Sequence, residues 1–113
     1  MNILFCQKFF NPSKGGIGKV TWVLIRAFRR LGINVHVIAI KNTGYFGENV
    51  VFMPSGNFDD SSENKSFLSN FIRENSIDVL INQEGLGRCG FDLFRKVCAN
   101  KCALVSVVHS QPL

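Results

Sequence analysis

The sequence lacks several features that would place a protein in a class at once. No apolar run approaches the about 20 residues that a membrane-spanning helix needs. The N-terminus has no basic segment followed by a long apolar stretch and a cleavage site, so export is not indicated. None of the cysteines, Cys6, Cys89, Cys98 and Cys102, belongs to a C-x-x-C pair typical of zinc binding. We therefore expect a cytoplasmic protein with free thiols, of which Cys6 and Cys102 are buried as small apolar side chains.

Motifs of common hydrolytic and metal-dependent enzymes are absent as well. The sequence has no Ser-His-Asp order, no His-x-x-x-His helix, no paired-carboxylate spacing, no internal repeat and no low-complexity segment. The net charge of +5 is modest, and no basic stripe is interleaved with aromatic residues. Nucleic acid is therefore not an expected partner. A chain of 113 residues has the size of one ordinary domain, residues 1–113.

What the sequence does contain is a strand, a glycine-rich loop, a helix and a second strand within residues 1–40. Residues 2–6 are a continuous apolar run, typical of a parallel strand buried on both faces. The apolar period changes to 3.6 over residues 17–31, Gly32 ends that helix, and residues 35–40 are apolar again. The helix stripe predicted to face the core consists of Ile17, Val20, Leu24, Ala27, Phe28 and Leu31. This unit is typical of the opening of a doubly wound α/β domain.

Two side chains in this unit allow either a structural or a functional interpretation. Trp22 is predicted on the polar side of the helix, near Arg26 and Arg29. Its ring could lie over the stems of those arginines, or it could contact a partner or the inner face of a membrane. His36 lies within the second predicted strand without an acidic neighbour, and we expect it to be structural.

The glycine-rich loop, residues 11–19, favours an anion site. Gly15 and Gly16 lack the Cβ atoms that would hold a ligand away from the backbone, and they expose the N–H groups of the helix N-terminus. Lys19 follows in the first turn. The alternative is that these glycines only let the chain turn sharply and pack closely.

A phosphate-binding P-loop is one interpretation of this loop. Residues 14–21 (KGGIGKVT) resemble the deviant Walker motif of partitioning ATPases. That motif has a hydroxyl side chain directly after Gly-Lys, where this sequence has Val20, and Thr21 points about 100° further round the helix. The hydroxyl that would ligate Mg²⁺ is missing, so an ATPase is kept only as an alternative function.

The remaining residues continue the alternation of strands and helices. We predict strands over residues 50–53, 77–81 and 103–108, and helices over residues 62–75 and 90–99. Asp59, Asp60 or Ser61 is expected to cap the first of these helices. Acidic residues are favoured at a helix N-terminus in any case, so Asp59 and Asp60 are not predicted to hold a metal. The predicted fold class is α/β, a doubly wound Rossmann-like parallel sheet of about five strands in a three-layer α/β/α arrangement.

Polar residues follow the fourth and fifth predicted strands, at the carboxyl edge where open α/β sheets bind ligands. Gln83, Glu84 and Arg88 come after the fourth strand and are candidate contacts to a ligand, or otherwise a solvated loop. His109 and Ser110 come after the fifth. A histidine there can donate a hydrogen bond to a ligand hydroxyl or stabilise developing charge; the alternative is a histidine satisfied by backbone carbonyls.

Taken in order, these segments resemble the N-terminal half of glycosyltransferase family 4. The resemblance is carried by the apolar first strand, Pro-x-x-Gly-Gly-Ile-Gly at residues 12–18, Arg-Arg-Leu-Gly at residues 29–32, Val-x-Val-Ile-Ala at residues 35–39, the strand at residues 77–81 and the strand at residues 103–110 that ends in His-Ser. It spans essentially all of the chain. The order of the motifs carries it, since each motif alone is loose.

The resemblance implies the acceptor-side domain of a GT-B fold, in which two Rossmann-like domains face a cleft. It implies transfer of a sugar from a nucleotide-sugar donor to a glycan or lipid-linked acceptor, with retained configuration, no metal and no other cofactor. The residues carried over are His109 for catalysis, Gly15, Gly16 and Lys19 for the donor phosphates or the acceptor, and Gln83, Glu84, Arg88 and Ser110 for the acceptor. A C-terminal domain would grip the nucleotide, and the 113 residues do not contain it. The chain alone is thus expected to be inactive; a stand-alone binding module is a further alternative.

Overall fold

Five parallel strands form one sheet with helices on both of its faces. The computed structural model describes residues 1–10, 16–41, 49–84 and 88–107, and only the backbone of residues 16–19, 88 and 89. The elements are β1 (Asn2–Phe9), α1 (Gly16–Arg30), β2 (Asn34–Lys41), β3 (Val50–Phe52), α2 (Ser62–Glu74), β4 (Val79–Asn82), α3 (Arg88–Cys98) and β5 (Ala103–Ser106). Among the helices described, none combines the length and apolar character needed to cross a membrane.

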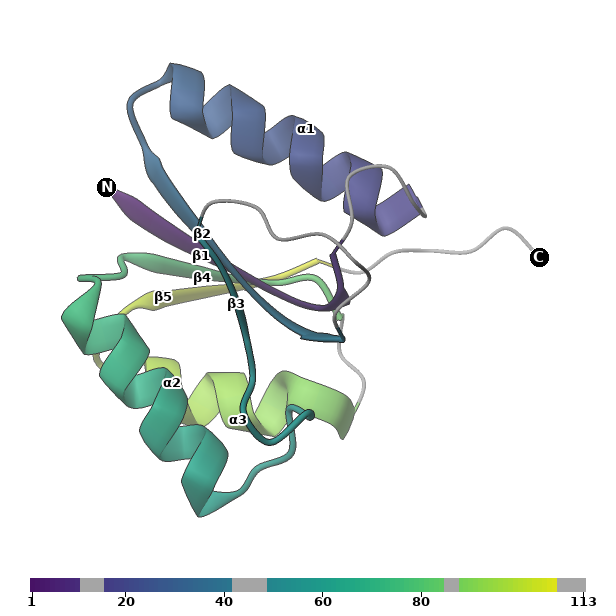
Figure 1. The fold of residues 1–113 in the computed structure, drawn as a ribbon. Coiled ribbons are helices and arrows are strands. Elements are labelled where there is room, and N and C mark those ends of the chain that lie inside the picture. Colours follow the sequence, from purple (N-terminus) through teal and green to yellow (C-terminus); the bar gives the residue numbers. More distant parts are fainter. Residues whose placement is uncertain (11–15, 42–48, 85–87, 108–113) are drawn as a thin grey trace.

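The sheet has the strand order β3-β2-β1-β4-β5, and its neighbours pair in parallel. Figure 1 shows α1 on one face of the sheet and α2 and α3 on the other. The predicted three-layer, doubly wound α/β class is therefore confirmed. β1 lies at the centre, with β2 on one side and β4 on the other, so the connections run in opposite directions from this point. In open α/β sheets that reversal marks the crevice where ligands bind.

The central strand is buried on both faces, as its apolar run predicts. Ile3 and Phe5 pack into the core beneath α1, whereas Leu4 and Cys6 pack into the core beneath α2 and α3. β1 extends beyond the predicted end at residue 6, to Phe9. The apolar run ends before Gln7, which is polar, and so it did not predict that Gln7 is a fully buried residue of the strand.

The face of α1 that packs on the sheet is only partly the predicted one: Leu24 and Phe28 of the predicted stripe pack against the core. Thr21 and Ile25 are buried and Phe28 is half-buried, with its ring centroid 6.2 Å from that of Phe5. Val20 and Leu31, both assigned to the core stripe, are 49% and 75% exposed. Residues 21, 25 and 28 lie on one side of an α-helix. This side is about a quarter turn away from the centre of the predicted stripe. Ala27 is also exposed, and the side chain of Ile17 is outside the described part.

Trp22 does not lie on the predicted side of α1. It is half-buried and packs against the core beneath α1, with Leu24 and Phe28. The prediction of a ring turned toward the polar side is therefore wrong. The same rotation of α1 explains it, since Trp22 lies about 100° beyond Thr21.

For α2 and α3 the apolar period predicts that Phe67, Leu68, Phe71 and Ile72 are buried, together with Phe91, Phe94 and Val97 or Cys98. Phe67, Phe71 and Phe91 are half-buried. Leu68 and Ile72 of α2 are buried, as are Phe94, Val97 and Cys98 of α3. Leu93, which was not predicted, is buried as well. The helix bounds differ from the predicted ones by at most two residues.

The start of α2 shows how its flanking polar residues are used. Ser61 is the N-cap, and its side chain accepts a hydrogen bond from the Asn64 backbone N–H at 3.1 Å. Asp60 forms ion pairs with Lys65 of α2 and Lys96 of α3. Hydrogen bonding to Lys96 lowers the pKa of the Asp60 carboxyl. Asp60 thus links the two helices, in keeping with its predicted structural role.

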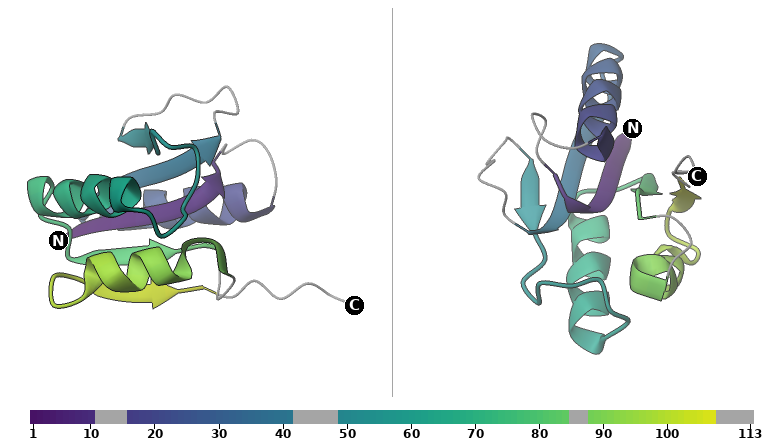
Figure 2. Two further views of the ribbon diagram at one scale, coloured as in Figure 1. Left: turned by 90° about the horizontal axis from the view of Figure 1, so that it is seen from below. Right: turned by 90° about the vertical axis from the view of Figure 1, so that its right-hand side faces the viewer.

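β5 is less buried than its apolar run predicted. Val105 is 46% exposed and Ala103 is exposed, because β5 ends the row of described strands and pairs there with β4. Figure 2 shows α3 beneath β4 and β5, while α1 lies over β1 and β2. Cys102 is half-buried, not buried as predicted. Cys6 is buried as predicted, and both are free thiols.

His36 packs against the core, and its titration should affect stability. Its ring meets Phe71 edge-on, with the centroids 5.6 Å apart. Burial lowers the pKa of His36, and the nearby Arg29 guanidinium lowers it further. The unfolded chain then binds a proton more readily than the folded one, since the unfolded pKa is about 6.5.

We therefore expect the free energy of unfolding to fall as the pH falls below about 6.5. Urea unfolding at several pH values, followed by circular dichroism, measures this slope. His36→Gln should flatten the slope in this interval. If the slope is the same in His36→Gln as in the wild type, His36 is not its source.

Candidate functional site

The carboxyl edge of the sheet carries a buried polar cluster where β1 and β4 end. β1 and β4 pair directly, with Cys6 opposite Asn82. Gln7, Asn82 and Gln83 are almost completely buried at this edge, and Thr21 of α1 is buried with them. A buried polar group loses its hydrogen bonds to water, so its burial costs free energy unless partners within the protein replace them.

Thr21 is at the centre of this cluster. Its hydroxyl donates a hydrogen bond to Gln7 Oε1 at 2.7 Å and accepts one from Gln83 Nε2 at 3.1 Å. Gln7 Nε2 donates to the carbonyl oxygen of Phe9 at 2.6 Å. These bonds join β1, the first turns of α1 and the segment after β4. They fix the beginning of α1 over the carboxyl edge, directly after the glycine-rich loop.

A second set of bonds joins the ends of β1, β4 and β5. The Glu84 carboxylate accepts a hydrogen bond from the Lys8 backbone N–H at 2.9 Å. The Glu84 N–H donates to Asn82 Oδ1 at 2.8 Å, and Asn82 Nδ2 donates to the Ser106 hydroxyl at 3.3 Å. Glu84 is half-buried, so its charge is held at the edge by a backbone donor.

The predicted site residues are brought together only in part. Gln83 and Glu84 lie side by side at the edge between β1 and β4. Gln83 is 1% exposed and donates inward to Thr21, so it faces the protein interior. Gly16 is the first residue of α1, and Arg88 is the first residue of α3.

Other predicted residues are beyond what the structure describes. Gly15, His109 and Ser110 lie outside the described residues, and Lys19 and Arg88 are described only in their backbone. Their predicted roles stay predictions.

Sequence reasoning missed Gln7, Thr21 and Asn82. Two signals could have found them. Thr21 lies at helical spacing from the apolar Ile25 and Phe28, which places its hydroxyl on the buried face. Gln7 and Asn82 each follow an apolar strand directly, at the edge where parallel sheets bind ligands.

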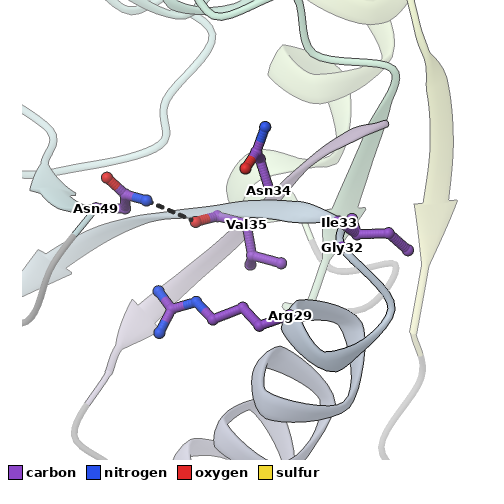
Figure 3. Close-up of a pocket in the computed structure, with 6 residues that line it drawn as sticks. All are labelled: Arg29, Gly32, Ile33, Asn34, Val35 and Asn49. Carbon is purple, nitrogen blue, oxygen red and sulfur yellow. Dashed lines mark hydrogen bonds between the residues drawn. The ribbon is translucent and has the colours of Figure 1, made fainter.

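Two grooves lie at opposite edges of the sheet. One, of about 330 Å³, lies at the carboxyl ends of β1 and β2 and is lined by Lys8, Phe9, Ile40, Lys41, Gly56 and Asn57. Lys41 Nζ lies 5.5 Å from the centroid of the Phe9 ring. The other, of about 300 Å³, lies at the amino end of β2 and is lined by Arg29, Gly32, Ile33, Asn34, Val35 and Asn49 (Figure 3). The groove with Lys8 and Lys41 is at the edge where such sheets bind ligands.

Two of the cysteines, Cys6 and Cys98, do not offer a reactive thiolate. Burial raises the pKa of the Cys6 and Cys98 thiols, so both are neutral at physiological pH. In the part of the chain that the structure describes, no three His, Cys, Asp or Glu side chains are grouped as metal ligands. No protein-family model matches the chain, and no curated protein matches it.

Proposed function

We propose that the chain is the acceptor-side domain of a retaining sugar transferase that uses a nucleotide-sugar donor. The observation that carries the proposal is the reversal of strand order between β1 and β4, beside which α1 begins at Gly16. A crevice forms at such a point outside the carboxyl ends of the strands. Backbone N–H groups at the start of α1 suit a phosphate or a hydroxyl-rich ligand there. The resemblance to glycosyltransferase family 4 supplies the reaction.

The groove beside this edge fits a sugar that carries negative charge. Lys8 and Lys41 supply positive charge, and Phe9, 52% exposed, offers an apolar ring surface. Asn57 adds amide donors and acceptors at the same groove. His109 would contact the transferred sugar, while Glu84, Arg88 and Ser110 would hold the acceptor.

The alternative ATPase function receives less support from the site. Its Mg²⁺ ligand would have to be a hydroxyl near the end of the loop. The Thr21 hydroxyl is fully buried between Gln7 and Gln83, and Val20 carries no hydroxyl. Mg²⁺ keeps several waters and needs near-octahedral access, which a buried hydroxyl does not offer.

Titration of nucleotide sugars into the isotope-labelled chain tests the proposal. With UDP-glucose and GDP-mannose as probes, we expect weak binding that shifts the amide resonances around Gly16 and Gln83. Gly16→Val should weaken this binding at least about tenfold, since a branched side chain separates the ligand from the backbone donors. His109→Ala should weaken it as well. No sugar transfer is expected from the chain alone.

Ala27→Val is the matched control for Gly16→Val. It adds a β-branched side chain to α1 at an exposed position far from the loop, so binding should be unchanged. If Gly16→Val and His109→Ala both leave binding unchanged, the proposed site is wrong. ATP binding that depends on Mg²⁺ and is lost in Lys19→Ala would favour the ATPase instead.

A further inference from the structure

The outward side of α1 combines exposed apolar and basic residues. Val20 is 49% exposed, Val23 is 63% exposed and Leu31, just after the helix, is 75% exposed. Between them lie the exposed residues Arg26, Ala27 and Arg30. We call these six residues the α1 outer face. Val23, Arg26, Ala27 and Arg30 line one shallow depression, so their side chains are neighbours.

Helical geometry places these residues opposite the core. Residues 20, 23 and 27 follow one another at spacings of three or four along one stripe, residues 26 and 30 lie together on one side of it, and Leu31 comes directly after the last residue of the helix. The buried side of α1 is centred on Thr21 and Ile25. In Figures 1 and 2, α1 is the outermost layer on its face of the sheet, and no segment that the structure describes covers its outer side.

Basic and acidic residues occupy different parts of the sequence. All of the acidic residues lie at position 48 or later, and seven Lys and Arg residues precede them: Lys8, Lys14, Lys19, Arg26, Arg29, Arg30 and Lys41. No acidic residue belongs to α1. The arginines of the α1 outer face are therefore not neutralised from within the helix.

We propose that the α1 outer face docks onto an anionic lipid surface. The helix would lie in the membrane plane, with its valines and Leu31 at the level of the acyl-chain boundary and Arg26 and Arg30 beside the headgroup phosphates. This inference does not depend on the proposed sugar transfer. It does not involve Trp22, which packs inward.

Other partners fit this surface less well. A nucleic-acid backbone would pair with the arginines but would gain nothing from exposed valines, and the α1 outer face presents no aromatic ring on which a base could stack. A second copy of the chain would bring like charges together. A lipid surface satisfies the apolar and the basic side chains at once.

Co-sedimentation of the purified chain with vesicles tests the proposal. We expect binding to vesicles of phosphatidylcholine with one third phosphatidylglycerol, much weaker binding to phosphatidylcholine alone, and weaker binding as salt increases. Arg26→Gln with Arg30→Gln should weaken binding to the anionic vesicles about 30-fold. Val20→Thr with Val23→Thr should weaken it several-fold, because the apolar insertion is reduced.

Two control variants test whether binding depends on the position of these residues in the α1 outer face. The alternative is that the loss of any exposed positive charge or any exposed valine has the same effect. Arg73→Gln with Lys101→Gln removes the same net charge at exposed positions of α2 and of the turn after α3, and should change binding less than about twofold. Val105→Thr makes the same exchange on β5, also at an exposed valine, and should have no effect. Circular dichroism checks that every variant is folded.

Equal binding to neutral and anionic vesicles, or no vesicle binding, would overturn the proposal. So would an equal loss in the Arg73→Gln, Lys101→Gln control. If the chain instead binds homopolymeric RNA, or if it forms dimers that the Val20→Thr, Val23→Thr variant abolishes, the surface serves that partner and not a membrane.

Discussion

Phe94→Ala is expected to lower the free energy of unfolding by about 3–5 kcal/mol. Phe94 is completely buried in the core beneath α2 and α3. Its ring meets that of Phe58 edge-on, with centroids 5.1 Å apart and an interplanar angle of 66°. Gly90 lies beneath the same ring at a φ of +95°, and a Cβ there would come within 2.8 Å of Phe94 Cε2. Removal of the ring would leave a cavity that this closely packed site cannot easily fill.

Urea unfolding followed by circular dichroism measures this loss. A domain of this size is stable by about 5–15 kcal/mol, so the variant should be marginal or unfolded at room temperature. Phe9→Ala is the matched control, because it deletes the same ring at a position that is 52% exposed. It should cost less than about 1 kcal/mol. Equal losses in the two variants would mean that Phe94 is not a core residue.

The order of the elements followed from the sequence because strands and helices alternate with different apolar periods. The apolar runs at residues 2–6 and 35–40 are typical of strands buried on both faces, as in a parallel sheet between helices, and the helical segments that alternate with them favour this arrangement. The rotation of α1 could not be predicted in the same way. Apolar residues occur around most of its circumference, so the stripe chosen, with Val20 and Leu31, and the one observed, with Ile25, fit the pattern about equally.

The apolar pattern likewise did not predict that β5 lies at the edge of the sheet. The run at residues 103–108 has the composition of a central strand, but β5 lies at the end of the row of described strands and Val105 is exposed. Burial of a strand depends on which helices cover it, and that is a property of the whole fold. Cys102, at the start of the same segment, is half-buried for the same reason.

The sequence predicted the edge of the sheet at which the candidate site lies, but it did not predict all of the residues that form the site. Sequence reasoning placed ligand contacts after the fourth strand, and Gln83 and Glu84 do lie where β1 and β4 end. It missed that Gln83 turns inward, because a polar residue after a strand is usually solvated. The packing of Thr21 against this edge shows that the polar cluster belongs to the interior.

Thr21→Val tests how much that cluster contributes. The exchange keeps the shape of the side chain and removes the hydroxyl, so Gln7 Oε1 loses its donor while it remains buried. An unsatisfied buried acceptor costs about 1–3 kcal/mol, and we expect the free energy of unfolding to fall by this amount. The weak binding of nucleotide sugars should fall with it, because the start of α1 is then no longer held at the edge.

Val20→Thr is the matched control, since it makes the reverse exchange at the adjacent residue. Val20 is 49% exposed, so water solvates the new hydroxyl and stability should change by less than about 0.5 kcal/mol. A neutral Thr21→Val would show that the cluster is dispensable. Val20→Thr also restores a hydroxyl directly after Gly-Lys, where a Walker motif has one. If the variant gains ATP binding that depends on Mg²⁺, the loop has the geometry of a P-loop, and its glycines would serve a nucleotide and not a sugar acceptor.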